Sequence, residues 1–574
     1  MRDVHRRAAL VWDFPDDGGL PPVDGTSCRR TMDERRRSQR GNTCCVLDCL
    51  LIGPEGIAAV RLPSHCHFQG LIMDLLGNML GGFAVALQPV NIAAALLGAL
   101  VGTATGVLPG LGVLGAMAIL MPITIHFSAV TGLIMLAGIY YGAMYGGSTT
   151  AILLRIPGES GSIVTTIDGY EFARKGRAGA ALMICAVGSF IAGTISIVGL
   201  SLFTTLLADV ALRFSSPEFC LLALLGGLTL VRITGNDPAQ NMVMLLVGMA
   251  LATIGVDAVS GDTRFTFNTS TLALGFDLVP VALGLYGLSE LFHVLASNEG
   301  FPRATTVRLR EMIPTRREWS RAWPAIVRGS GIGFLIGLLP GPGSLTSTFA
   351  SYGVEKAIAR THRDEFGKGA IEGFAGPEAA NNAVATSALV PVLSLGIPFT
   401  PNVALMLGAL IVQGIQPGPL LLSQHPDVVW GLLASMYIGN VALLALNLPL
   451  VGMWVRLLRV PQYALIGFIF AISFVGVYTV RNSYWDLCVL VGFGVVGSVL
   501  RQIGFDLAPM ILGLVIGPIF EKALRETLFL SGGDFTIFVT RPISAVLSAL
   551  CVVAVVGPTI AVWIRRGSRV PQQS

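Results

Sequence analysis

The stretch Gly98–Gly112, GALVGTATGVLPGLG, has a glycine at every fourth position and then reaches a proline. On a helix these glycines line one face, where a neighbouring helix can approach to backbone contact. Pro109 then interrupts the helix, because a helix interior does not accept proline without a kink or a break. The same pattern recurs at Gly329–Gly343, GSGIGFLIGLLPGPG, where four glycines, a leucine, a proline and a final glycine match at one offset of 231 residues. The chain therefore contains a duplicated unit.

The composition is that of a membrane protein. The 574 residues have a mean hydropathy of +0.71 and only 13% are charged, whereas soluble domains carry about 25%. Apolar runs near the roughly 20 residues that a span needs recur throughout. We predict an all-α polytopic membrane protein with about 12 transmembrane helices in two repeats, some of them broken or re-entrant. A soluble all-helical protein would need polar helix faces that these runs lack. The net charge of +4 gives no reason to expect nucleic acid, and the nine cysteines show no metal-binding C-x-x-C spacing.

The changes of composition along the chain divide it into five regions. The first 72 residues are rich in arginine and show no amphipathic period, so they are either a disordered basic tail or a mis-assigned leader upstream of a true start at Met73. We predict a basic leader at 1–72, a first membrane repeat at 73–297, a basic cytoplasmic linker at 298–328, a second membrane repeat at 329–566 and a cytoplasmic tail at 567–574.

Loop charges differ between the two repeats in a way that predicts inverted topology. Lysine and arginine mark the cytoplasmic side of short loops. Between the two proline breaks of each repeat, the first has only His126 and Arg155, whereas the second has Lys356, Arg360, Arg363 and Lys368. After the second break the pattern reverses, because the first repeat has Arg174, Lys175 and Arg177 and the second has none before Arg456. Inverted repeats with broken helices that meet near the membrane midplane are a design of secondary transporters.

Two polar clusters in apolar surroundings are the candidate binding site. Irregular backbone at membrane depth is tolerated only where protein buries it or a cavity solvates it. Helix N-termini at such breaks offer N–H groups to an anion, and neighbouring hydroxyls and carboxamides can bind a carboxylate. A structural alternative is that these side chains only cap the broken helices. We predict substrate binding by Gly146, Gly147, Ser148, Thr149, Thr150, Asn381, Asn382 and Thr400, with structural breaks at Pro109, Gly110, Pro157, Gly158, Pro340, Gly341 and Pro398.

Few ionisable residues lie near these breaks, and a charge inside a membrane is a candidate functional group. They are Arg155, Glu159, Asp168, Glu372 and Glu378. Glu378 lies one helical turn before the asparagine pair, so we predict that it binds the coupling ion, which is Na⁺ or H⁺. We expect no other cofactor and no bound metal. The G-K-[ST] ending of a Walker A loop is absent at Gly367-Lys368, so we expect no ATP hydrolysis.

Six motifs together resemble the large membrane subunit of the tripartite tricarboxylate transporter family: GTATGVLPGLG, YYGAMYGGSTTAILLRIPGE, DGYEFARKGRAGAAL, GLLPGPG, GPEAANNA and LGIPFTPNVALMLGAL. The resemblance implies a multi-pass symporter of the bacterial inner membrane that imports citrate-like and other organic acid anions, driven by a cation gradient. It also implies two partners, a small membrane subunit of about four helices and a periplasmic solute-binding protein. An alternative function is an intramembrane enzyme that acts on a lipid-linked substrate, for which the sequence offers no convincing pair of catalytic groups. A channel or structural subunit is a third class.

Overall fold

The computed structural model describes residues 65–108, 112–233, 237–257, 260–296, 309–341, 343–457 and 462–567. The chain forms two compact units, Met1–Asp74 and Leu75–Ser574. In the first unit, only the start of helix α2 (His65–Ala86) is described, so the predicted leader lies outside the described residues up to residue 64. The predicted tail lies outside them from residue 568.

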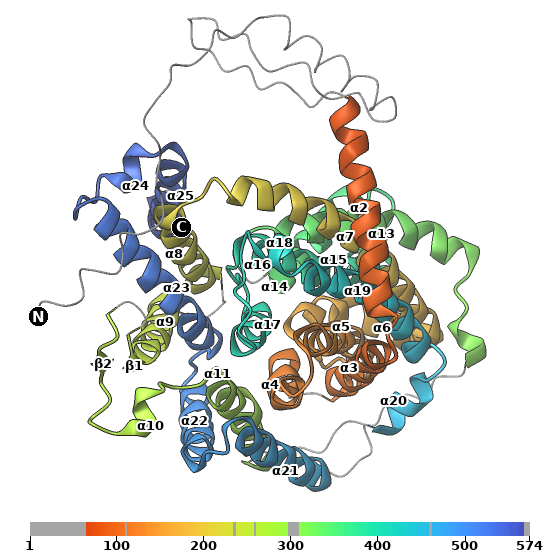
Figure 1. Cartoon of the computed structure of the whole chain (residues 1–574). Helices are drawn as coiled ribbons and strands as arrows, with labels where there is room; N and C mark the ends of the chain where they lie inside the picture. The colour runs from red at the N-terminus through yellow and green to blue at the C-terminus, as the bar shows by residue number, and fades with distance from the viewer. Residues whose placement is uncertain are drawn as a thin grey trace, which may run out of the picture. The chain divides into compact units, whose positions relative to one another are not determined.

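Helices make up nearly all of the described structure (Figure 1). The elements that belong to the first predicted repeat are α3 (Pro89–Val107), α4 (Gly112–Thr124), α5 (Ala129–Leu154), η1 (Ser160–Ile163), α6 (Thr165–Phe172), η2 (Ala173–Arg177), α7 (Ala178–Ala211), α8 (Ser216–Ile233), α9 (Pro238–Ala252), β1 (Gly255–Val256), β2 (Thr263–Arg264), α10 (Ser270–Ala273), α11 (Leu278–Ala282), η3 (Leu283–Leu288) and α12 (Ser289–Ala296). Strands β1 and β2 form an antiparallel pair.

The second repeat and the linker before it contain η4 (Leu309–Met312), α13 (Arg316–Gly337), α14 (Gly343–Ile358), η5 (Arg363–Glu365), α15 (Glu372–Ser387), α16 (Leu389–Leu395), α17 (Pro401–Val412), α18 (Leu421–Gln424), α19 (Pro426–Asn447), α20 (Val451–Leu457), α21 (Gln462–Arg481), α22 (Tyr484–Gln502), α23 (Ala508–Leu530), α24 (Ile537–Thr540) and α25 (Pro542–Gly567). Helix α13 begins inside the stretch that we predicted as linker. Thr315 and Glu318 form a capping box there, which satisfies the first free N–H groups of the helix.

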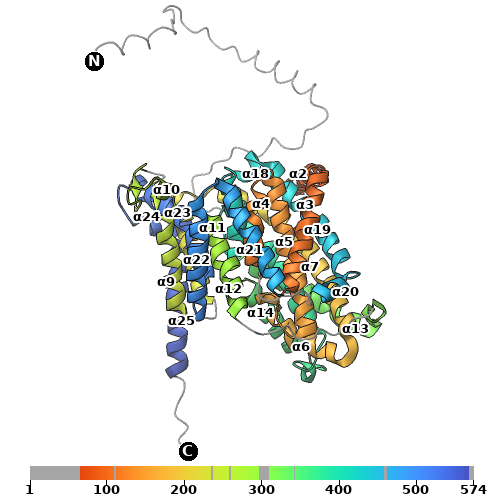
Figure 2. The same cartoon turned by 90° about the horizontal axis from the view of Figure 1, so that it is seen from below.

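The protein is an all-α membrane protein. Five described helices are long and apolar enough to cross a membrane, at Pro89–Val107, Ala129–Leu154, Thr165–Ala208, Pro426–Asn447 and Tyr484–Gln502, and eight shorter apolar helices accompany them. The apolar window of α5 is 94% buried inside the protein, whereas that of α22 is 28% buried. Figure 2 shows α5, α9 and α22 with roughly parallel axes. Helix α5 is therefore an internal helix surrounded by protein, and α22 is peripheral.

The first glycine seam is the contact of α3 with α5, and it follows the glycine spacing of the sequence. A Cβ added to Gly102 would lie 2.7 Å from the Ile139 Cα, and one added to Gly106 would lie 2.8 Å from the Ala143 Cα. The contact is reciprocal, because a Cβ on Gly142 of α5 would lie 2.6 Å from the carbonyl oxygen of Ala99. The backbones of the two helices thus touch, as the spacing predicts.

The second glycine seam joins α13 to α15 in the same way. A Cβ added to Gly329 would lie 2.9 Å from the carbonyl carbon of Gly376, and one added to Gly333 would lie 2.8 Å from that of Ala380. Each repeat therefore packs its glycine helix directly on the helix that carries its polar cluster.

The chain turns at both kinds of predicted break. Pro340 and Gly341 lie between α13 and α14, whereas Pro109 and Gly110 fall outside the described residues, between the end of α3 and the start of α4. Pro157 and Gly158 lie between α5 and η1, and Pro398 lies between α16 and α17. The two latter turns share a backbone conformation. Arg155 caps α5 at φ 61° and ψ 24°, and Gly396 caps α16 at φ 73° and ψ 20°.

Candidate functional site

Both polar clusters are helical. Gly146–Thr150 lies inside α5, which continues to Leu154, and Gly376–Asn382 lies inside α15, which accommodates Pro377. The prediction of irregular backbone at these clusters is therefore wrong. A buried helix satisfies its own N–H and C=O groups, so tertiary burial overrides the weak helix propensity of glycine and asparagine. Irregular backbone occurs just beyond the first cluster, from Arg155 to Glu159.

Three members of the first cluster have structural contacts. Gly146 belongs to the first glycine seam, because a Cβ there would lie 2.8 Å from the backbone nitrogen of Val107. A Cβ on Gly147 would lie 3.1 Å from the Glu159 Cγ. The Thr150 hydroxyl donates to the Gly147 carbonyl at 3.0 Å. Thr149 is buried beside them. Ser148 is the member that reaches the other repeat.

The carboxylate of Glu378 lies where three helices meet. The Ser148 hydroxyl of α5 donates to its Oε1 at 2.5 Å, and the Thr165 hydroxyl of α6 donates to its Oε2 at 2.8 Å. On α15 itself, Asn382 Nδ2 lies 3.5 Å from the same Oε1. Glu378 is completely buried. The second repeat thus supplies the acid, and the first repeat supplies two hydroxyl donors to it.

One proton controls the hydrogen bonding of Ser148. Its Oγ lies within reach of two acceptors, Glu378 Oε1 and the Met144 carbonyl oxygen at 3.2 Å, and a hydroxyl has a single hydrogen. With Glu378 ionised, Ser148 donates to the carboxylate. With Glu378 protonated on Oε1, the acid donates to Ser148, which then donates to Met144. Both charge states of Glu378 can therefore be satisfied by rotating one hydroxyl group.

A second carboxylate, which is half-buried, makes a similar contact between the repeats in the opposite sense. Glu159, which follows α5, accepts from Asn381 Nδ2 of α15 at 2.6 Å and from the backbone N–H of Gly161 at 2.9 Å. Asn381 is fully buried, and its Oδ1 has no hydrogen-bond partner among the described residues. Here the first repeat supplies the acid and the second supplies the donor.

Neither acid has a basic partner in the described part of the chain, where all ion pairs of glutamate involve other residues. A buried charge without a partner is costly, so burial favours a proton or a bound cation at such a group. Within the described residues, no three His, Cys, Asp or Glu side chains gather to hold a metal ion. The side-chain atoms that face the Glu378 carboxylate are hydroxyl and amide groups, which can accompany a neutral acid or an ionised one.

Of the other predicted residues, Asn382 contacts the Glu378 cluster and Thr400 does not. Asn382 Nδ2 donates to the Ser189 hydroxyl of α7 at 2.6 Å and to the Glu378 carbonyl at 3.1 Å, so it belongs to the Glu378 cluster. Thr400 is the N-cap of α17, and its hydroxyl is buried without a hydrogen-bond partner among the described residues. It forms no hydrogen bond to the cluster.

Sequence reasoning missed Thr165 and Ser189 and did not commit to Glu159 as a site residue. Thr165 begins a polar stretch that looked solvated, but its side chain is fully buried. Ser189 is one small hydroxyl in a long apolar helix. Neither carries a local signal, because its role depends on a partner some 200 positions away.

Asp168 fixes the start of α15. Its Oδ1 accepts backbone N–H bonds from Gly367 at 2.8 Å, Gly369 at 2.7 Å and Ala370 at 2.9 Å. The Tyr352 hydroxyl donates to its Oδ2 at 3.1 Å. Asp168 is fully buried. This carboxylate therefore ties α6 of the first repeat to the loop that leads into the helix of Glu378.

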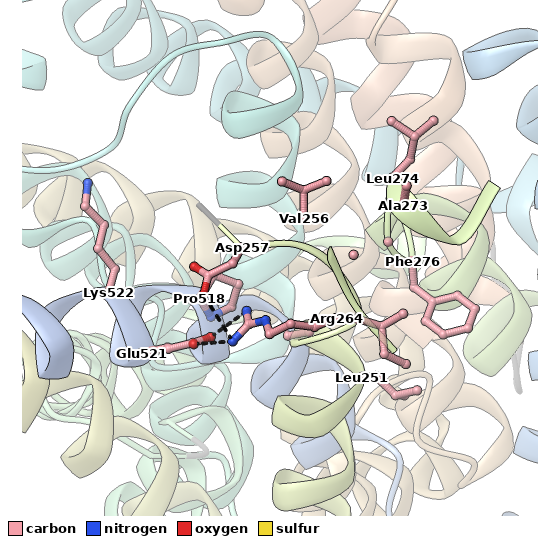
Figure 3. Close-up of a pocket in the computed structure, with 14 residues that line it drawn as sticks. Leu251, Val256, Asp257, Arg264, Ala273, Leu274, Phe276, Pro518, Glu521 and Lys522 are labelled. Carbon is pink, nitrogen blue, oxygen red and sulfur yellow. Dashed lines mark hydrogen bonds and ion pairs between the residues drawn. The ribbon is translucent and has the colours of Figure 1, made fainter. Parts of the chain in front are cut away.

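A separate pocket of about 440 Å³ lies between the ends of α9 and α23 and strands β1 and β2 (Figure 3). Three of its charged lining residues form ion pairs, because Arg264 pairs with Glu521 at 2.5 Å and with Asp257 at 3.7 Å. Arg525, outside the lining, also pairs with Asp257 at 2.5 Å. The pocket shares no lining residue with the Glu378 cluster, so these ion pairs join the loop to α23 and do not extend the candidate site.

One family model matches most of the chain, and two uncharacterized proteins are similar to it. The family model described as "Tripartite tricarboxylate transporter TctA family" matches residues 92–512. The chain is 44% identical over 492 residues to an uncharacterized 52.8 kDa protein in the TAR-I ttuC' 3' region of Agrobacterium vitis, which covers 85% of this chain and 98% of that protein. It is 46% identical over 231 residues to an uncharacterized protein in the TAR-II ttuC' 3' region of the same organism, covering 40% of this chain and 95% of that protein. No solved structure matches the chain.

Proposed function

Because this chain belongs to the tripartite tricarboxylate transporter TctA family, we propose that it is the transmembrane permease of a secondary transporter for organic acid anions. Its cargo is a tricarboxylate or a related acid. A cation gradient across the bacterial inner membrane drives the import. A periplasmic binding protein delivers the cargo, and a small four-helix membrane subunit completes the complex.

The observation that carries this proposal is the Glu378 cluster. A completely buried acid on α15 accepts hydrogen bonds from α5 and α6 and has no basic partner in the described residues. Such a group takes up a cation when it is exposed to one side of the membrane and releases it on the other. The cation neutralises Glu378, so an anionic cargo can occupy the neighbouring space without repulsion. Coupling then arises because cargo and cation favour each other's binding.

Contacts that exchange between the repeats support inverted topology. Helix α5 ends at Leu154 and α16 ends at Leu395, 241 residues later, and each is followed by a left-handed residue and an Ile-Pro turn. We call residues with this separation equivalent. Helices α7 and α19 follow the two turns in matching order, and α15 packs on α7 while α5 packs on α19. Each repeat thus places its own central helix against the long helix of the other.

The loops also contact the opposite repeat. The turn before α15 is bound by Asp168 of α6, and a Cβ added to Gly132, just after the turn before α5, would lie 3.3 Å from Gln413 Nε2 at the end of α17. Lys175 of the first repeat donates to the carbonyl of Lys368 in the second at 2.5 Å, so the basic segments of both repeats share one side. This arrangement agrees with the positive-inside rule for inverted repeats.

An uptake assay tests the proposal. Cells that lack other carboxylate carriers would express the chain with its two partners, and the entry of labelled citrate and succinate would be measured. We expect accumulation that collapses when the Na⁺ and H⁺ gradients are removed. Uptake that survives the loss of both gradients would contradict the coupling. No uptake of any organic acid by a correctly inserted complex would contradict the transport function.

Variants of the two acids locate the coupling. We expect Glu378→Gln to abolish gradient-driven accumulation and to retain exchange of labelled for unlabelled acid, because glutamine keeps the shape and cannot take up the cation. Asn381→Ala should reduce uptake about tenfold or more, since it leaves Glu159 without its donor. The control is Glu526→Gln, which removes a peripheral acid that, within the described residues, contacts Lys522 at 4.0 Å and the Ser216 hydroxyl. Unchanged uptake by Asn381→Ala would exclude the contact between Asn381 and Glu159 from the transport site.

A further inference from the structure

A narrow cleft lies beside the Glu378 cluster, between α5, α7, α15 and α19. Its volume is about 10 Å³, which is room for a single water molecule. The cleft is therefore closed around its lining in this conformation. The lining residues are Tyr141, Tyr145, Gly193, Ile197, Asn382, Thr386, Met436 and Asn440.

These eight residues are four matched pairs. Tyr141 and Asn382 have the same separation as Leu154 and Leu395, and so do Tyr145 and Thr386. Gly193 and Met436 share a second separation, of 243 residues, with Ile197 and Asn440. Each residue that lines the cleft from the first repeat thus has a matching lining residue in the second repeat. Inverted-repeat transporters bind their cargo at the interface between the repeats, and a cavity lined by both repeats is expected there.

The hydrogen bonds around the cleft leave one strong donor poorly used. The Tyr145 hydroxyl donates to Asn440 Oδ1 at 2.9 Å, and Asn440 Nδ2 donates to the Phe190 carbonyl at 2.8 Å. By contrast, the Tyr141 hydroxyl donates to the thioether sulfur of Met436 at 3.7 Å, with the Thr386 hydroxyl as a further neighbour, although Tyr141 is only 8% exposed. Thioether sulfur is a weak acceptor. A carboxylate oxygen would be a far stronger partner for this buried phenol.

The cleft is also linked directly to the acid. Asn382 lines it and donates to the Glu378 carbonyl at 3.1 Å, with the carboxylate oxygen Oε1 at 3.5 Å. A ligand that binds the amide of Asn382 changes the hydrogen bonding of Glu378 with no intermediate residue. Cargo and cation sites would therefore be coupled through one side chain.

We propose that this cleft is the cargo site, and that it binds an acid with a carboxyl group at each end. Tyr141, Tyr145 and Asn440 bind one carboxylate, and Asn382 and Thr386 bind the other. This inference rests on the proposed transport function and adds Tyr141, Tyr145, Thr386 and Asn440 to the predicted substrate-binding residues, which already include Asn382. The main basis is that the lining residues come in pairs, one from each repeat. A cleft lined in this way presents polar side chains to both ends of a ligand.

The first test is Tyr141→Phe in the uptake assay with succinate, which has two carboxylates, and butyrate as a competitor of equal chain length with one. Loss of a hydrogen bond to a charged group should raise KM for succinate about tenfold or more, with a smaller change in kcat. We expect butyrate to compete poorly with succinate in the unmodified protein. The matched control is Tyr437→Phe on α19, a half-buried tyrosine whose ring stacks on Phe83 with centroids 6.1 Å apart and does not line the cleft.

The outcomes separate this inference from the proposed function. If the unmodified protein accumulates succinate while Tyr141→Phe keeps the same KM, the cleft assignment is wrong and the transport function stands. Effective competition by butyrate would overturn the requirement for two carboxylates.

A second measurement does not depend on transport. Ile197→Cys introduces a thiol into the cleft, and its labelling by a water-soluble thiol reagent would be compared with that of the unmodified complex. Succinate at saturating concentration should slow the additional labelling several-fold, and butyrate should not. Labelling that succinate leaves unchanged would overturn the proposal even if Tyr141→Phe were poorly folded.

Discussion

The two glycine seams use one sequence pattern to make unequal contacts. In the first seam, Gly138, Gly142 and Gly146 of α5 oppose the glycines of α3, so both helices lack side chains at the contact. In the second seam, α13 brings the glycines and α15 meets them with Gly376, Ala380 and Val384. The glycine helix of a repeat therefore defines the packing, and its partner helix is free to diverge. That freedom allows α15 to carry an acid at the depth where α5 carries hydroxyl groups.

The largest expected effect comes from filling a seam. Gly333→Leu places a side chain where even a Cβ would lie 2.8 Å from the Ala380 carbonyl carbon. Because backbone on both sides blocks relaxation, the loss of stability should exceed the about 1–3 kcal/mol typical of an overpacked core. Gly102→Leu should be at least as damaging in the first seam, since it meets backbone at 2.7 Å. The measurement is the midpoint of thermal unfolding in detergent, followed by size-exclusion chromatography.

The control lies on the same helix. Gly331→Leu changes an exposed position where an added Cβ has no atom within 4 Å, so it should unfold at the midpoint of the unmodified protein. Equal midpoints for Gly333→Leu and Gly331→Leu would show that the second seam is not a backbone contact.

The next effect compares how the two repeats satisfy a buried acid. Asp168→Ala removes the acceptor of the buried N–H groups of Gly369 and Ala370. Each orphaned donor costs about 1–3 kcal/mol, so the free energy of unfolding should fall by about 2–4 kcal/mol. Glu355→Ala instead frees Arg328, whose side chain is 36% exposed and can turn to water. Its cost should be smaller, nearer 1 kcal/mol. Denaturation of the two purified variants side by side gives the comparison, and the reverse order would contradict it.

The smallest effect concerns the two left-handed turns. Gly396→Ala adds a Cβ in a conformation that costs an ordinary residue about 1–2 kcal/mol, and it also approaches the Pro417 carbonyl carbon to 2.8 Å. Gly414→Ala is the control for conformation alone, because Gly414 has φ 77° with open space around it. At the equivalent position of the first repeat, Arg155→Gly relieves strain but loosens the unfolded chain, so stability should change by less than about 0.5 kcal/mol. Calorimetry on all three variants would reveal a larger Arg155→Gly effect if the two turns differed.

The architecture was more predictable than the site. The glycines at 98, 102, 329 and 333 line helix faces that touch a partner backbone, as their spacing indicates. The polar clusters were assigned irregular backbone but lie in helices, because single-sequence propensity does not account for burial. Gly147 and Asn382 are both in continuous helix.

The contacts that assemble the site could not be read from the sequence. The separation in sequence between the glycine helix and its partner helix is ten residues longer in the second repeat than in the first. Gly98 faces Met135 in the first repeat, and Gly329 faces Gly376 in the second. The offset that matches the two glycine motifs therefore fails for α5 and α15. At that offset Ser148 corresponds to Ala379, and the matching of Tyr141 with Asn382 across the cleft is hidden.

The absence of side chains at the first seam has a mechanical consequence. Two helices whose backbones interlock have no rotamers to exchange, so α3 and α5 move as one rigid body. In the second seam, α13 touches the backbone of α15 at Gly376 and Ala380 but meets the Ser387 side chain at Gly337, so backbone contact alone holds this pair of helices over a shorter length. Any rocking that opens the interior to one aqueous compartment and then to the other must take place where long side chains lie between helices, at α7 against α15 and α5 against α19. The glycine spacing therefore determines which helix pairs are held rigidly and which helix pairs can move against each other.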